Sequence, residues 1–181
     1  MEGGPPTALD PATLDTHGIE DFGGLAKAFS AHPKIDPDSG EMFNFGIDYG
    51  AKTTLTPYRI DRGIATRLPP VTLPYPVMNH DFALTERYLV FCLGPILVHP
   101  LKFLLGLRSF DGALQWDGSR PTMILLVPRD GRGEPRWIET DAFFQFHFAN
   151  GFEEDGTLVL DLARYPNYGT IGEALRSYWQ S

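Results

Sequence analysis

Short stretches of alternating apolar and polar residues, separated by tight turns, constrain the fold of this chain more than any other feature. The clearest case is 137–161, where an aromatic run at 143–148 leads through a turn at 153–156 into residues 157–162. In that last segment, leucines at every second position alternate with Thr157, Val159 and Asp161. Such alternation is typical of a strand. We therefore predict strand, turn, strand.

A second β-hairpin is predicted at 41–60. Its first strand places four apolar side chains on one face, Gly50 turns the chain, and residues 52–60 return. Residues 122–128 are continuously apolar, which predicts a fully buried strand. The 19 glycines and 16 prolines suit many short turns, and no helical periodicity of useful length appears. The predicted fold class is all-β, as a propeller or a sandwich.

Composition excludes some functions. The formal net charge is −8, which argues against nucleic acid as a partner because that would need a basic face. The single cysteine, Cys92, excludes an internal disulfide framework and favours a reducing compartment. The first residues lack the basic and apolar regions of a signal peptide. A cytoplasmic location is therefore expected.

The most apolar part of the chain is 94–110, but glycines, prolines and two basic residues interrupt it. It falls short of the roughly 20 uninterrupted apolar residues that a spanning helix needs. A segment that dips into one leaflet of a membrane and a segment buried in a larger core are both open interpretations.

Three histidines, His32, His80 and His147, stand near the predicted starts of strand regions, in apolar or proline-rich company. Taken alone, His147 is most simply interpreted as a core histidine bonded to backbone. The wide separations of the three histidines are close to one histidine per propeller blade. Because inner strands of a propeller converge on its axis, three such imidazoles would meet at one metal, with zinc, copper and iron as candidates.

The amino-acid sequence around each histidine identifies a family more specifically than the spacing between the histidines does. Residues 31–37 (A-H-P-K-I-D-P), 80–88 (H-D-F-A-L-T-E-R-Y) and 146–154 (F-H-F-A-N-G-F-E-E) resemble, in order and spacing, three metal motifs of the carotenoid cleavage oxygenases. The resemblance implies a seven-bladed β-propeller with a non-haem Fe(II) on its axis, one ion per domain, held by four histidines. Dioxygen would take an open position as co-substrate. His32, His80 and His147 match three of the four ligands.

The same resemblance suggests roles for other residues. Glu2 matches a glutamate that supports the ligands from outside the metal's coordination sphere, and a frayed terminal residue is the alternative interpretation. Phe146 and Tyr165 match positions that line the substrate tunnel, where aromatic walls suit a polyene. Residues 95–107 occupy the place of the family's membrane-dipping patch, so peripheral membrane contact is expected.

No histidine follows His147, so the fourth ligand is expected beyond Ser181. Residues 1–181 are accordingly interpreted as one incomplete propeller domain that lacks the N-terminal blade and the C-terminal blades. The implied reaction of the intact protein is cleavage of a conjugated C=C bond of a carotenoid or apocarotenoid with O2, giving two carbonyl products such as retinal. Two alternatives stay open: a lignostilbene-type dioxygenase acting on a phenolic stilbene, and a truncated, non-catalytic remnant that binds a polyene.

Overall fold

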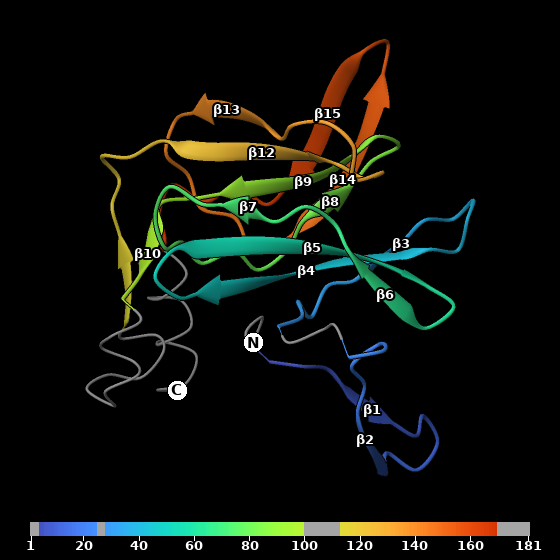
Figure 1. Ribbon diagram of the computed structural model, residues 1–181. Coiled ribbons are helices and arrows are strands. Elements are labelled where there is room, and N and C mark those ends of the chain that lie inside the picture. The colour runs from blue at the N-terminus through green and yellow to red at the C-terminus, as the bar shows by residue number, and fades with distance from the viewer. Residues whose placement is uncertain (1–3, 25–27, 100–112, 170–181) are drawn as a thin grey trace. The chain divides into compact units, whose positions relative to one another are not determined.

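The computed structural model describes residues 4–24, 28–99 and 113–169, and the elements within these ranges are all β-strands (Figure 1). The predicted all-β class is confirmed. The chain divides into two compact units, residues 1–73 and 74–181.

The first unit is built on a four-stranded antiparallel meander, with β7 also paired to β5. A small hairpin of two short strands precedes it. The predicted hairpin at 41–60 is confirmed, with Met42 opposite Ile60 and Tyr49 opposite Thr53. The strands are β1 (Thr7–Leu9), β2 (Thr16–Ile19), β3 (Lys34–Ile35), β4 (Met42–Tyr49), β5 (Thr53–Asp61), β6 (Ile64–Arg67) and β7 (Val71–Thr72).

The core of the first unit is built on β4 and β5. Phe43, Phe45 and Ile47 of β4 are buried, as is Leu55 of β5. Burial does not alternate along β4, because Asn44 is also fully buried; its side-chain amide donates a hydrogen bond to the Ser30 carbonyl oxygen (2.8 Å). Gly46 lets residue 28 approach β4 closely, because a Cβ built there would lie 2.2 Å from the Ala28 carbonyl oxygen.

The second unit holds another four-stranded antiparallel sheet, with strand order β13-β12-β9-β8, and two separate hairpins, β10–β11 and β14–β15 (Figure 1). Leaving out the β10–β11 hairpin, this sheet is again a meander in sequence order. The strands are β8 (Ala83–Leu84), β9 (Tyr88–Leu93), β10 (Ile96–Val98), β11 (Leu114–Trp116), β12 (Thr122–Pro128), β13 (Arg136–Thr140), β14 (Phe148–Glu154) and β15 (Thr157–Leu162).

Three local expectations need correction. The aromatic run at 143–146 is not a strand; it forms only an isolated bridge between Phe144 and Tyr165. The turn between β14 and β15 is shorter than predicted and consists of Asp155 and Gly156, both with positive φ. Strand β12 has the predicted bounds, but its positions 123 and 124 are only half-buried.

The apolar segment proposed to contact membranes is described only at 95–99, where β10 lies; residues 100–107 are outside the described residues. Within the part of the chain that the structure describes, no helix is long and apolar enough to span a bilayer.

Candidate metal centre

Each of the three predicted ligands lies just ahead of the first strand of a sheet. His32 stands two residues before β3, His80 three residues before β8, and His147 directly before β14. The expectation that the histidines occupy equivalent places is met by the secondary structure.

In the second unit, His80 and His147 face each other. Their ring centroids are 5.2 Å apart and the ring planes are inclined by 66°. His80 is half-buried and His147 is exposed. This centroid distance leaves room for one metal ion between the two rings, with one nitrogen of each ring about 2.1 Å from the ion.

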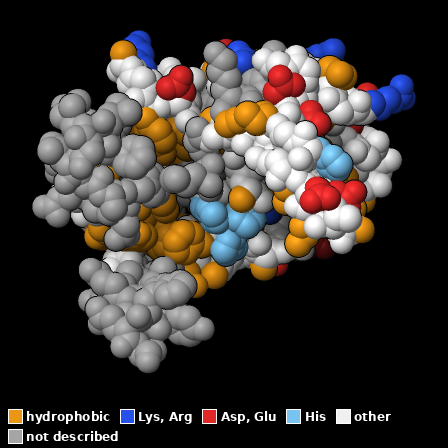
Figure 2. All heavy atoms as spheres, turned by 90° about the horizontal axis from the view of Figure 1, so that it is seen from below, with side chains coloured by type: hydrophobic (Ala, Val, Ile, Leu, Met, Phe, Trp, Pro, Cys, Tyr) orange, Lys and Arg blue, Asp and Glu red, His pale blue; other side chains and the backbone are white. Residues whose placement is uncertain are grey.

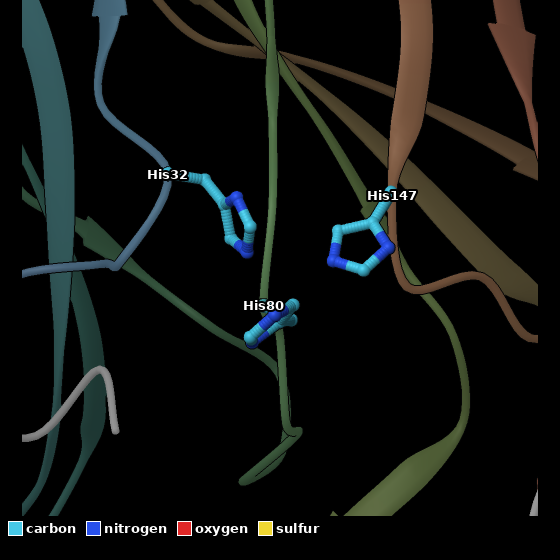
Figure 3. A group of neighbouring side chains, drawn as sticks. All are labelled: His32, His80 and His147. Carbon is cyan, nitrogen blue, oxygen red and sulfur yellow. The ribbon is translucent and has the colours of Figure 1, made fainter.

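His32 belongs to the same metal-compatible group. Each of His32, His80 and His147 offers one ring nitrogen, and these atoms all lie within 4.8 Å of one another (Figure 3). A space-filling view shows histidine side chains gathered at the surface with hydrophobic side chains beside them (Figure 2). A donor set of imidazoles alone suits iron, zinc or copper rather than magnesium or calcium.

Aromatic side chains pack beside the two histidines of the second unit. The Phe146 ring meets His80 edge-on, with centroids 5.5 Å apart, and lies 6.0 Å from the His147 ring. Phe144 packs against Phe146 at 4.7 Å and against Tyr165 at 6.2 Å. The two predicted tunnel residues, Phe146 and Tyr165, thus belong to one aromatic cluster, in which Phe144 connects them.

Asp81, which is 1% exposed, joins the two ligand-bearing segments of the second unit. Its Oδ1 accepts a hydrogen bond from the backbone N–H of Phe82 (2.8 Å) and its Oδ2 accepts one from the N–H of Phe148 (2.9 Å). Two backbone donors offset much of the cost of burying a carboxylate.

A second carboxylate, Glu153 on β14, fastens the same hairpin to the turn between β8 and β9. Its Oε1 accepts hydrogen bonds from the Thr85 hydroxyl (2.8 Å) and from the Arg87 N–H (3.0 Å), and its Oε2 pairs with the Arg87 guanidinium. Burial works to raise the pKa of Glu153, but hydrogen bonds from Arg87 and Thr85 outweigh it, so the pKa lies below the ordinary glutamate value.

Of two further residues that the sequence singled out, only Cys92 lies within the described residues. Glu2 lies outside the described residues, so its role stays a prediction. Cys92 on β9 is 3% exposed, and burial raises the pKa of its thiol to about 12. It is a small apolar core residue and takes no part in the centre.

Sequence reasoning did not assign roles to Asp81 and Glu153. A usable signal was present, because each acid follows an aromatic or histidine residue within a strand-like apolar stretch, where a carboxylate must find donors.

Comparison with known proteins places the chain. The model of the retinal pigment epithelial membrane protein family, the carotenoid cleavage oxygenases, matches residues 1–180. The chain belongs to this family.

Among its relatives, the apocarotenoid-15,15'-oxygenase of Synechocystis is 38% identical, with 95% of this chain and 38% of the relative aligned. Resveratrol cleavage oxygenase 1 of Aspergillus fumigatus is 37% identical, over 89% of this chain and 33% of the relative. The crystal structure of cobalt-substituted Synechocystis apocarotenoid oxygenase superposes with a TM-score of 0.82 at 39% identity, covering 92% of this chain and 36% of that one. The chain thus spans about a third of the length of these relatives.

Proposed function

We propose that this chain is the ligand-bearing part of a non-haem Fe(II) dioxygenase that cleaves a conjugated C=C bond of an apocarotenoid. The carrying observation is the group of three histidine ring nitrogens within 4.8 Å of one another, in a chain of the carotenoid cleavage oxygenase family.

The fold proposed for the intact protein is a seven-bladed β-propeller, of which these residues supply several blades. Two four-stranded meanders in sequence order support this, because a propeller blade is such a sheet. The histidine ahead of β3, β8 and β14 would then mark the innermost strand of three successive sheets. The blades that close the ring are proposed to lie outside these residues.

The donor set fits ferrous iron. Two nitrogens bound to one ion at about 2.1 Å lie at most roughly 4.2 Å apart, so a group within 4.8 Å needs only small rotamer shifts to close on it. When bound, the iron would supply activation of dioxygen at a position that protein ligands leave open. His32, His80 and His147 would hold the ion as neutral imidazoles.

The aromatic cluster suits a polyene substrate. Phe144, Phe146 and Tyr165 offer apolar area beside His80, which would orient the substrate chain and exclude water from the bond to be cleaved. The overall reaction is R–CH=CH–R′ + O2 → R–CHO + R′–CHO. It is balanced without any external reductant, because each carbonyl receives one oxygen atom of O2.

The test uses the complete protein that contains this chain, loaded with Fe(II) and given an apocarotenal under ¹⁸O2. Mass spectrometry at short times, before exchange with water, should find one ¹⁸O atom in the new carbonyl of each product. A protein that holds iron but releases no aldehydes under O2 would contradict the proposed activity.

A phenolic stilbene is the alternative substrate, because resveratrol cleavage oxygenase 1 is almost as similar to this chain as the apocarotenoid oxygenase. The ratio of kcat/KM for an apocarotenal to that for resveratrol decides between them. A ratio well above one supports the polyene, and a ratio well below one the stilbene. A third outcome, purification with bound polyene absorbance but without iron, would indicate a non-catalytic binding protein.

We further propose a cytoplasmic protein that contacts membranes peripherally through residues 95–107. The apolar composition of this segment supports the proposal. Co-sedimentation of the complete protein with phosphatidylcholine vesicles, weakened by Leu97→Asp, is the expected result. Equal sedimentation with and without vesicles would contradict it.

A further inference from the structure

His80 and His147, the two proposed metal ligands of the second unit, are far apart in sequence. One buried side chain connects their segments by hydrogen bonds. Asp81 directly follows His80, and Phe148 directly follows His147. The Asp81 carboxylate accepts a hydrogen bond from the Phe148 N–H. A single carboxylate therefore spans a gap of 147 − 80 = 67 residues in the chain.

The Asp81 carboxylate is held from several sides. Its other oxygen accepts the Phe82 N–H at 2.8 Å, which fixes the side-chain rotamer relative to its own backbone. The Asn79 amide, also buried, donates to the Asp81 carbonyl oxygen at 2.9 Å. His80 thus lies between two residues whose side chains both brace the local backbone. With the rotamer fixed, the second oxygen sets where Phe148, and with it His147, can lie.

Strand pairing fixes His147 relative to β15 but not relative to His80. Phe148 pairs with Leu162, and the His147 carbonyl oxygen accepts a hydrogen bond from the Ala163 N–H (3.4 Å); β14 then shows a register irregularity between Phe148 and Asn150. The charge-assisted hydrogen bond from the Phe148 N–H to Asp81 supplies a directional restraint between the two histidine segments that this ladder does not. A metal site needs this precision, because small displacements of a ligand weaken binding.

We propose that Asp81 is a positioning residue that sets the separation of His80 and His147 through its two backbone hydrogen bonds. This inference rests on the proposed metal centre. Asp81 would act on metal affinity and geometry through the backbone, by keeping the two imidazoles at the spacing that the ion requires.

The test compares Asp81→Asn and Asp81→Ala with Asp141→Asn, an exposed control with the same loss of charge, in the complete metal-free protein. Asparagine keeps one acceptor oxygen and alanine keeps none. Titration with Co(II), followed by its visible bands, should show Kd raised about 10–100-fold in the asparagine variant and further in the alanine variant. The bands should shift in both, whereas Asp141→Asn should match the wild type.

Circular dichroism of the metal-free variants separates positioning from folding. Lower melting temperatures with an unchanged Kd and unchanged bands in the folded protein would overturn the inference and leave the metal centre intact. Equal Co(II) affinity in wild type and His147→Ala would instead overturn the proposed centre itself, and the inference with it.

A second variant covers the case in which the Asp81 substitutions fail to fold. Replacing the Phe148 residue by its α-hydroxy acid converts one amide to an ester, which removes the N–H donor while keeping both side chains. Weaker Co(II) binding with shifted bands supports the inference, and wild-type binding overturns it.

Discussion

Glu153 illustrates how one side chain can fasten two elements of this fold. It is 7% exposed and accepts hydrogen bonds from Thr85 and Arg87, on the turn between β8 and β9. Arg87 itself is largely exposed, so its charge is screened by water and contributes little. The stabilisation comes mainly from hydrogen bonds to the buried carboxylate.

Glu153→Gln is expected to lower the free energy of unfolding by about 1–2 kcal/mol at pH 7. Because the pKa of Glu153 is lowered on folding, its stabilisation is present above the unfolded-state pKa of about 4.3 and is lost as the pH falls below it. The difference between wild type and variant in urea unfolding should therefore shrink below about pH 4.3. Glu154→Gln, at an exposed neighbour, is the control; an equal effect there would contradict the assignment.

Cys92 is expected to be inert in the native protein. Its thiol is buried and its pKa is raised to about 12, so almost no thiolate is present at pH 8. Iodoacetamide should label it only after denaturation, as measured by mass spectrometry. Rapid labelling without denaturant would show that β9 opens readily.

At the level of single residues, the sequence points to the three histidines as candidate ligands but not to the acids that connect their segments. The histidine motifs are local in sequence and can be read directly. The partners of Asp81 and Glu153 are brought to them by the pairing of sheets, because Phe148 lies 67 residues from Asp81 and Arg87 lies 66 residues from Glu153. No local sequence pattern therefore predicts which hydrogen-bond donors will lie beside Asp81 and Glu153.

At the level of elements, strands with strong alternation were predicted well. The hairpin of β4 and β5 and the bounds of β12 match the expectation. The strands β1 and β2 were missed because they are short and mostly exposed, so no apolar alternation marks them. The run at 143–146 was misread because its phenylalanines serve an aromatic cluster rather than a strand face.

Close packing between β14 and β8 depends on Gly151. A Cβ at this position would lie 2.8 Å from the Cβ of Ala83 and 3.3 Å from Cδ2 of Leu160. Gly151→Ala is expected to cost about 1–3 kcal/mol through overpacking. Thermal unfolding should report a fall of roughly 2–4 °C per kcal/mol for a chain of this size.

Gly50→Ala is the matched control for that substitution. The atom nearest to a Cβ at Gly50 lies at 3.5 Å, which is ordinary contact, so its melting temperature should stay near that of the wild type. Equal losses in both variants would show that glycine flexibility, rather than packing against Ala83, is what matters.

At the level of the whole molecule, three of the described sheets have a histidine just ahead of their first strand, and the chain spans about a third of the length of its relatives. The all-β class was predictable from alternation and turns. The ring closure of a propeller was not, because it depends on blades that the resemblance places outside these residues. We expect these histidines to hold iron in the complete protein.

The most direct test is the iron content of the complete protein, measured by inductively coupled plasma mass spectrometry after anaerobic Fe(II) loading and desalting. The wild type and His17→Ala, which changes an exposed histidine, should retain about one iron per chain. His80→Ala and His147→Ala should each retain almost none, with loss of turnover. Full iron retention in either of these two variants would show that the substituted histidine is not an iron ligand.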